Sequence, residues 1–331
     1  MIITVDCGST NMRCRLFNEY DLVDETKKKV GIRNTAFDGS SAVLRTTLRE
    51  CIEELLQKNA LSEKDIEIVI SAGTLSSDVG IYRVPHVLAP VGAKESAIGA
   101  KKVILDDITQ IPILFLPGVR TYPDESTSDP EERIEATDSM SGEECETFGI
   151  MSLLGIDGDF IITLPGSYTK TFYVDPNGQI TNILTGMCGE FIAAMSEHTL
   201  LRHSLPIPPI QTIIPEKLIQ GFDYCSHHGT SPSLIKARNL RLWNNWTDDE
   251  AANFFVGAIL ADDIKLTLKM YTPGKRVIVG GADPLRAVFR SLLVHAGILQ
   301  KDITVIDEST SRLSSSIGAI NVYKIFKALH A

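Results

Sequence analysis

Runs of apolar or alternating residues are separated along this chain by longer segments in which apolar residues recur every three or four positions. The runs predict strands at residues 2–6, 13–17, 22–27, 66–70, 111–116, 160–164, 171–174, 180–184, 276–282 and 303–306. The longer segments predict helices at residues 40–57, 139–154, 248–271, 284–295 and 309–329, with mostly helical sequence throughout 187–271. Strands that alternate with helices in this way are typical of an α/β fold.

The opening pattern of the chain returns about half a chain later. Residues 2–17 predict a strand, a turn with Gly8 and Ser9, and a returning strand. Residues 160–174 predict the same arrangement around Gly166 and Ser167. Such a turn leaves backbone N–H groups and hydroxyls at the bend, where they can bind phosphate oxygens. The repeat therefore indicates a phosphoryl-transfer enzyme that arose by duplication.

Length and charge narrow the class of protein. At 331 residues the chain is long enough for two domains, which we place at residues 1–140 and 141–331, with a helical insertion at about 187–271. A net charge of −10 argues against nucleic acid and acidic membranes as partners. Part of this charge lies in residues 121–138, a polar and acidic stretch that predicts a mobile surface loop.

Other features of the composition indicate a cytoplasmic protein. No apolar run approaches the length of a membrane span, and the first residues lack the basic and apolar regions of a signal peptide. The six cysteines, at positions 7, 14, 51, 145, 188 and 225, show no C-x-x-C spacing, which is typical of reduced thiols. For the assembly, a homodimer is the default expectation.

Polar residues at the first turn have the chemistry of a nucleotide phosphate site. Asp6, at the end of its strand, can hold Mg²⁺ through water beside the phosphates. The turn that follows offers close backbone approach and hydrogen-bond donors at Gly8, Ser9, Thr10 and Asn11. Arg13, on the returning strand, can reach a phosphate or an acidic substrate. A lone Asp-x-Gly is also a common plain turn, and it is the second Gly-Ser turn that favours phosphate binding.

Two further glycine-containing segments are candidates for ligand binding. Residues 71–80 form a loop of small residues at the carboxyl end of a predicted strand, where α/β folds bind ligands. Gly280, Gly281 and Ala282 end another strand and can form a surface for adenine or ribose, although a plain strand-to-helix turn would explain them as well. The chain has no G-x-x-x-x-G-K-[ST] motif, so it is not a P-loop enzyme, and its histidines show no metal-binding spacing.

Short motifs spread over nearly the whole chain resemble those of one known family. They are residues 6–13 (DCGSTNMR), 72–80 (AGTLSSDVG), 116–118 (LPG), 140–146 (MSGEECE), 165–171 (PGSYTKT), 188–190 (CGE) and 280–285 (GGADPL). In the same order, the 2-dehydro-3-deoxygalactonokinase family has D-W-G-[ST]-[ST]-N-x-R, A-G-M-x-x-S-x-x-G, I-P-G, M-R-G-E-E-T-Q, P-G-T-H-x-K-W, T-G-E and A-G-T-S-L. The chain thus resembles the sugar kinase, actin and Hsp70-type ATPase superfamily.

This resemblance implies a fold and a reaction. The fold would be two ribonuclease H-like domains with a nucleotide cleft between them, the actin-like ATPase architecture. The reaction would be ATP-dependent phosphorylation of a 2-keto-3-deoxy sugar acid, 2-dehydro-3-deoxy-D-galactonate or a relative, at its terminal hydroxyl, giving the 6-phosphate and ADP. Phosphoryl transfer needs positioning and charge neutralisation more than covalent chemistry, which fits the two phosphate-binding turns.

The resemblance also implies roles for single residues. Mg²⁺ held near Asp6, the two Gly-Ser turns and Lys170 would bind the β- and γ-phosphates of ATP. Glu143 and Glu144 are candidates for the base that accepts the proton of the attacking hydroxyl, with Asp78 in reserve. Either glutamate could instead complement the dipole of its helix. The residues expected on the substrate side are Arg13, Gly73, Ser77, Asp78 and Glu190.

The chain departs from the family at three motif positions. Cys7 and Thr171 stand where the family has tryptophans, and Cys188 stands where it has threonine. The loss of two aromatic side chains is expected to change the shape of the sugar pocket and to leave the phosphate clamps intact. The basic residues available for the carboxylate of a sugar acid are Arg13, Arg83 and Arg120.

Two readings from other functional classes stay open. A phosphoanhydride hydrolase on the same fold would consume ATP without a sugar acceptor. A non-catalytic nucleotide or sugar sensor would need no base. The presence of charged residues suited to catalysis argues against a sensor; these are Asp6, Glu143, Glu144 and Lys170.

Overall fold

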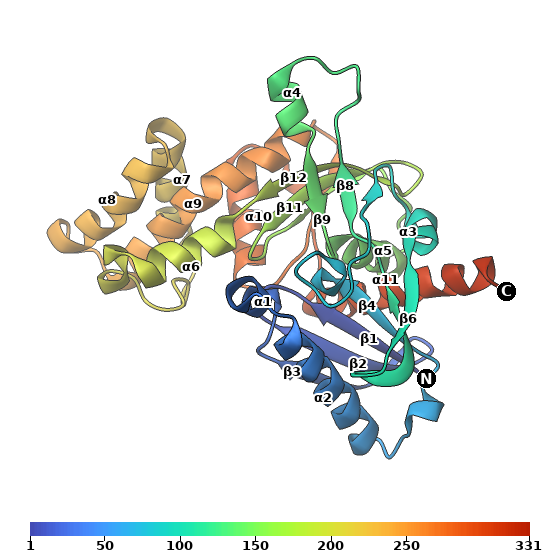
Figure 1. The fold of residues 1–331 in the computed structure, drawn as a ribbon. Coiled ribbons are helices and arrows are strands. Elements are labelled where there is room, and N and C mark those ends of the chain that lie inside the picture. Colours follow the sequence, from blue (N-terminus) through green and yellow to red (C-terminus); the bar gives the residue numbers. More distant parts are fainter. The chain divides into compact units, whose positions relative to one another are not determined.

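The computed structural model describes residues 1–331, with the side chains of residues 36–38 excepted. It has an α/β fold (Figure 1) that separates into two compact units. The first unit comprises Met1–Gly158, Asp175–Ile183 and Ser309–Ala331; the second comprises Asp159–Val174 and Leu184–Glu308. The predicted domain boundary after residue 140 falls inside the first unit, and that boundary stays a prediction.

The first unit is built on a six-stranded sheet in the order β3-β2-β1-β4-β7-β6. Its strands are β1 (Ile2–Cys7), β2 (Met12–Asn18), β3 (Asp21–Lys28), β4 (Ile68–Gly73), β6 (Lys101–Leu105) and β7 (Thr109–Phe115). β1 runs antiparallel to β2 and parallel to β4, and β4 runs parallel to β7. The carboxyl ends of β1 and β4 therefore meet at the same edge of the sheet.

Helices cover both faces of this sheet. Successive side chains of its central strand point to opposite faces, so the strand packs against a different helix on each side. Ile3, Val5 and Cys7 of β1 are buried in the core formed with α2 (Ala42–Lys58). On the opposite face, the hydroxyl of Thr4 donates to Ser316 Oγ of α11 (Glu308–Leu329) at 2.8 Å. Figure 1 shows α2 and α11 on either side of the strands.

A second helix, α5 (Glu143–Leu154), crosses α11 at close range. A Cβ atom at Gly149 would lie 1.8 Å from the carbonyl oxygen of Ser314, and one at Gly318 would lie 1.8 Å from that of Cys145. Only glycine permits such an approach, so the two helices touch backbone to backbone. This contact fixes the position of α5 against α11 within the first unit.

A small three-stranded sheet leads into α5. Its strands are β5 (Val87–Leu88), β8 (Val119–Thr121) and β9 (Asp138–Met140), in the order β5-β8-β9. β8 runs parallel to β5 and antiparallel to β9, and Figure 1 shows β8 beside β9. The short helices of the first unit are α1 (Ile32–Asp38), α3 (Ala93–Gly99) and α4 (Pro130–Glu135).

The five-stranded sheet, most of which belongs to the second unit, repeats the strand order of the first sheet. It runs β12-β11-β10-β13-β14, with β10 (Phe160–Leu164), β11 (Thr169–Val174), β12 (Ile180–Gly186), β13 (Arg276–Val279) and β14 (Ile303–Val305). Like β1, β10 is antiparallel to the strand that follows it and parallel to the strand on its other side. The shared topology agrees with the repeat that the sequence predicts.

Helices fill the remainder of the second unit. They are α6 (Cys188–His198), α7 (Pro215–His228), α8 (Thr230–Trp243), α9 (Asp248–Met270) and α10 (Leu285–His295). α9 packs closely on α7, since a Cβ at Gly221 would lie 1.9 Å from the carbonyl oxygen of Phe254. Within the part of the chain that the structure describes, no helix is both long enough and apolar enough to cross a membrane.

Two local predictions are wrong. Residues 121–138 are not a continuous loop, because the Asp129 side chain accepts from the N–H groups of Glu131 and Glu132 and caps α4. The helix predicted to start at Ser139 starts at Glu143, because Ser139 belongs to β9 and Gly142 interrupts the chain with a φ of +114°. The longer strands and helices lie within a few residues of their predicted positions.

Candidate functional site

The turn between β1 and β2 is held in place by the start of α1. The N–H of Ile32 donates to the carbonyl of Gly8 at 3.2 Å, and that of Arg33 donates to the carbonyl of Ser9 at 3.0 Å. A Cβ at Gly31 would lie 2.4 Å from the Ser9 carbonyl, so this contact requires glycine. A Cβ at Gly8 would meet nothing within 4 Å. The packing of the chain therefore does not require glycine at position 8. A ligand that approaches the backbone closely would require it.

The turn between β10 and β11 repeats this construction. The N–H of Glu190, in the first turn of α6, donates to the Ser167 carbonyl at 2.9 Å. A Cβ at Gly189 would lie 2.2 Å from the carbonyl oxygen of Gly166. Gly166 itself is open, since a Cβ there would lie 3.4 Å from its nearest neighbour, the carbonyl oxygen of Tyr168. Gly31 is thus the counterpart of Gly189, a role that the sequence shows only as a glycine before a short helix.

Asp6 and Arg13 lie side by side at the first turn. They are register partners on the antiparallel strands β1 and β2, and both are half-buried. Among the residues whose side chains are described, no three His, Cys, Asp or Glu side chains gather into a metal site. Magnesium that arrives with nucleotide phosphates is commonly bound by one or two carboxylates, with waters and phosphate oxygens completing its octahedron. A single carboxylate at the end of β1 fits that role.

The start of α5 lies against the carboxyl ends of β1 and β4. A Cβ at Gly142 would lie 3.0 Å from the Cα of Gly73, and one at Gly73 would lie 2.8 Å from the Cys7 carbonyl oxygen. Both glycines have positive φ values, +114° and +90°. The hydroxyl of Thr74 also donates to the Cys7 carbonyl, at 2.6 Å. These contacts bring Glu143 and Glu144 to the edge of the sheet where β1 ends, one residue after Asp6.

The two glutamates differ in their surroundings. Glu144 is 1% exposed, and both of its carboxyl oxygens accept from the N–H of Gly142, at 3.0 and 2.8 Å. Burial, reinforced by the neighbouring charge of Glu143, raises the pKa of Glu144 to about 8. Glu143 is only half-buried, and its Oε2 accepts from the N–H of Ser141 at 3.0 Å. Glu144 therefore has the surroundings of a helix-start carboxyl group, and Glu143 is the more accessible of the two carboxylates.

The raised pKa of Glu144 predicts how stability depends on pH. In the unfolded chain this group titrates near 4.5, so between about pH 4.5 and 8 the folded protein holds a proton that the unfolded chain has lost. The contribution to stability is then full below pH 4.5 and is lost as the pH rises to 8, by on the order of 5 kcal/mol in total. Thermal unfolding of the wild type should show this fall, and Glu144→Gln should lack it. Equal pH dependence in the two proteins would contradict the assignment.

Ser77 and Asp78 lie at a cavity of about 370 Å³ in the first unit. Arg83 and Arg120, two of the basic residues named for a sugar-acid carboxylate, share its lining with His86, which the sequence did not single out. Gly73, also expected on the substrate side, is instead buried in the packing of α5 against β1. Its part in the site is to allow that packing.

Lys170 and the glycine loop belong to the second unit. The ammonium of Lys170 donates to Thr185 Oγ1 at 2.8 Å. The N–H of Gly280 donates to the Thr163 carbonyl at 2.9 Å, and a Cβ at Gly281 would lie 2.4 Å from the Pro165 carbonyl oxygen. The loop that ends at Ala282 is therefore packed on the second Gly-Ser turn.

Buried charged residues that sequence reasoning missed support the second unit's loops. Arg286 is 5% exposed and donates to Asp283 Oδ2 at 2.5 Å and Glu308 Oε2 at 3.0 Å, next to the glycine loop. Asp263, also 5% exposed, accepts from the N–H of Cys188 at 3.3 Å and so holds the start of α6. Burial raises the pKa of Asp263. Neither residue stands in a recognisable motif, and only the folded chain reveals their positions.

The side chains of Cys7 and Thr171, which stand where the family has tryptophans, are both buried. Cys7 is 1% exposed and belongs to the core beneath the first sheet. Thr171 is fully buried, and its hydroxyl donates to Thr163 Oγ1 at 3.0 Å. Both side chains therefore fill the interior of their units. Cys188, the third departure, is also buried, with its Sγ 3.0 Å from Thr169 Oγ1.

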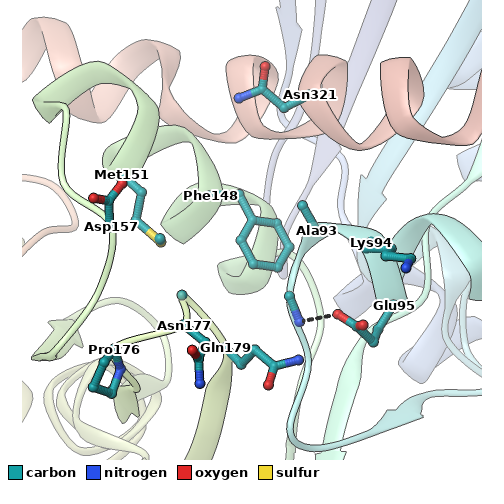
Figure 2. Close-up of a pocket in the computed structure, with 12 residues that line it drawn as sticks. Ala93, Lys94, Glu95, Phe148, Met151, Asp157, Pro176, Asn177, Gln179 and Asn321 are labelled. Atoms are coloured by element: carbon teal, nitrogen blue, oxygen red, sulfur yellow. Dashed lines mark hydrogen bonds between the residues drawn. The ribbon is translucent and has the colours of Figure 1, made fainter. Parts of the chain in front are cut away.

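A separate cavity of about 620 Å³ lies further along α5 (Figure 2). Phe148 and Met151 reach it from α5, and Asn321 reaches it from α11. Another wall is the start of α3, where the N–H of Gly92 donates to Glu95 Oε2 at 2.9 Å. None of the predicted site residues contributes to its lining, so we do not include it in the candidate site.

Comparisons with known proteins match this chain to one family of enzymes. A family model described as 2-keto-3-deoxy-galactonokinase matches residues 6–312. The chain is 25% identical over 270 residues to the 2-dehydro-3-deoxygalactonokinase of Escherichia coli (strain K12), covering 79% of this chain and 78% of that protein.

Solved structures show the fold. The structure of a candidate 2-dehydro-3-deoxygalactonokinase from Sinorhizobium meliloti matches with a TM-score of 0.74 at 18% identity, covering 99% of each chain. The activator of the 2-hydroxyisocaproyl-CoA dehydratase from Clostridium difficile, with bound ADPNP, matches with a TM-score of 0.52 at 15% identity, covering 99% of this chain and 96% of that one. The predicted actin-like ATPase fold is thereby confirmed.

Proposed function

Since this chain belongs to the 2-keto-3-deoxy-galactonokinase family, a family of sugar-acid kinases, we propose the following reaction for it. It transfers the γ-phosphoryl group of ATP to the terminal hydroxyl of a 2-keto-3-deoxy sugar acid, 2-dehydro-3-deoxy-D-galactonate or a relative, giving the 6-phosphate and ADP. The observation that carries the proposal is the pair of Gly-Ser turns, each held by the start of a helix and each with an open glycine, Gly8 or Gly166.

We assign the nucleotide to the polar groups of these turns and their neighbours. The phosphate oxygens would accept hydrogen bonds from Ser9, Thr10, Asn11 and Ser167, while the ammonium of Lys170 offsets their charge. The loop at Gly280, Gly281 and Ala282 would lie against the adenosine. Asp6 would hold the Mg²⁺ that accompanies ATP, and this ion would supply charge neutralisation at the phosphates. Glu190, at the start of α6, would contact the substrate.

Glu143 is the group we propose as the base. The terminal hydroxyl oxygen of the sugar acid bonds to the γ-phosphorus, and the bond from that phosphorus to the bridging oxygen of ADP breaks. The hydroxyl proton passes to the Glu143 carboxylate. Asp78 lines the cavity on the acceptor side and would bind sugar hydroxyls, which replaces its reserve role as base. Arg13, the neighbour of Asp6, would contact a phosphate or the acceptor.

A coupled ADP-release assay with Mg-ATP and a panel of 2-keto-3-deoxy sugar acids tests the proposed reaction. We expect ADP release that depends on the acceptor, with the 6-phosphate as the second product. ADP release at the same rate without any acceptor would identify a phosphoanhydride hydrolase instead. Tight nucleotide binding without turnover of any acceptor would identify a sensor.

Location and assembly are part of the same proposal. All six cysteines are free and buried, which suits a reducing compartment, and we place the enzyme in the cytoplasm. We also propose a homodimer, the commonest assembly among soluble oligomers in general. Light scattering on a size-exclusion column would measure the mass of the particle directly.

A further inference from the structure

We propose that Arg83 and Arg120 bind the carboxylate of the sugar acid, and that they set the preference of the enzyme for an acid over a neutral sugar. This inference rests on the proposed function. It goes further by assigning the charged group of the substrate to named residues of the first unit.

The two arginines share one cavity. Its volume of about 370 Å³ lies within the range of ~300–1,000 Å³ that is usual for small-molecule sites. Its polar lining consists of Ser77, Asp78, Arg83, His86 and Arg120. Two guanidinium groups against one carboxylate leave this lining with an excess of positive charge, in a protein whose net charge is −10.

Both guanidinium groups are available to a ligand. Arg83 and Arg120 are exposed, and neither forms an ion pair with any residue whose side chain is described. The guanidinium of Arg120 lies 5.8 Å from the centre of the Tyr122 ring, a contact that orients it without neutralising it. A planar guanidinium matches a carboxylate with two parallel hydrogen bonds, which an ammonium cannot do.

The cavity lies next to the proposed base. His86 precedes β5, and its Nε2 is 3.0 Å from Ser141 Oγ. The N–H of Ser141 in turn donates to Glu143 Oε2 at 3.0 Å. Only two hydrogen bonds therefore separate a wall of the cavity from the carboxylate that would accept the proton.

The small sheet explains this arrangement. Arg120 lies on β8, with Leu88 of β5 as its register partner on one side and Ser139 of β9 on the other. β9 then runs directly into Ser141 and the start of α5. A Cβ at Gly118 would lie 2.7 Å from the His86 ring, so glycine before β8 leaves room for that ring. One sheet thus carries both the carboxylate-binding arginine and the chain that leads to the base.

The chemistry of the remaining lining fits the rest of the acceptor. The hydroxyl of Ser77 donates to the Thr74 carbonyl at 2.7 Å, which leaves its oxygen lone pairs to accept from a sugar hydroxyl. Asp78 can accept from sugar hydroxyls in the same way. Arg13 does not share the lining; it lies beside Asp6, where its charge serves the phosphates better than the sugar acid.

The test compares acid and neutral acceptors. Arg83→Gln, Arg120→Gln and the double variant are assayed with a 2-keto-3-deoxy sugar acid and with its carboxamide, in which the charge is absent. Each single change should raise KM for the acid about 10- to 100-fold, the effect of losing a charge-assisted hydrogen bond. KM for the carboxamide, KM for ATP and kcat should stay within about threefold. Arg290→Gln, an exposed arginine of α10, serves as the matched control.

Calorimetric titration of the sugar acid into ATP-free enzyme gives a second readout, which does not depend on turnover. Weaker binding of the acid to the Arg83 and Arg120 variants, with unchanged binding to Arg290→Gln, would support the inference. An unchanged KM and affinity for the acid, an equal loss for acid and carboxamide, or an absence of acid binding to the wild type would overturn it. Failure of the proposed function would look different, because the wild type would then turn over no acid whatever its affinity.

Discussion

Replacing Glu143 with glutamine should lower kcat for phosphorylation of the sugar acid by about 10²- to 10⁴-fold, the usual contribution of a general base. KM for both substrates should change little, because the amide is close in size to the carboxylate and leaves the surroundings of the side chain intact. The effect is large because the carboxylate is accessible: Glu143 is half-buried and lies at the edge of the sheet where β1 ends. Steady-state kinetics by ADP release measures both parameters.

Two neighbouring glutamates provide the controls for this experiment. Glu146→Gln changes a carboxylate in the same first turn of α5, and glutamine is the family's residue at that position, so activity should be kept. Glu144→Gln should reduce kcat less than tenfold, because a buried carboxyl group with a pKa of about 8 is largely protonated at neutral pH. A loss in Glu144→Gln that exceeds the loss in Glu143→Gln would transfer the role of base to Glu144.

The second large effect is expected for Asp6→Asn. A neutral amide at the end of β1 holds a hydrated Mg²⁺ far less well than a carboxylate, so kcat should fall by on the order of 10²- to 10³-fold. The Mg²⁺ concentration needed for half-maximal activity should rise at the same time. A titration of activity against Mg²⁺ at fixed ATP separates this effect from general damage to the protein.

Asp21→Asn is the matched control for this variant. It makes the same change at an exposed position on β3 of the same sheet. It should leave kcat and the Mg²⁺ requirement unchanged, and both variants should unfold at nearly the wild-type temperature. If Asp6→Asn retained full activity with an unaltered Mg²⁺ requirement, the assignment of the metal to Asp6 would be wrong.

The sequence predicts the central strands well because their patterns are strong and repeated. β1 with β2, and β10 with β11, each show an apolar strand, a Gly-Ser turn and a returning strand, and both pairs lie where they were expected. Short elements are harder to predict. The acidic composition of residues 121–138 hid α4, whose cap at Asp129 depends on a single residue, and β8 is only three residues long.

The candidate site shows the same limit. The motif around Glu143 and Glu144 does not separate two adjacent carboxylates, and they differ only because the contact of Gly142 with Gly73 fixes the start of α5. Cys7 and Thr171 stand in motifs, yet their side chains lie in the interior. Arg83 and His86 belong to one segment of the chain and Arg120 to another, so the cavity that they share exists only after folding.

The crossing of α5 with α11 sets the order in which the enzyme can be completed during synthesis. The second unit is inserted in the sequence between these two helices, so a ribosome makes nearly all of it before α11 emerges. Until then, α5 lacks the partner whose backbone meets Gly149, and the face of the first sheet that carries Thr4 stays uncovered. A nascent chain can therefore make its second unit before the helix that bears Glu143 gains its partner in α11.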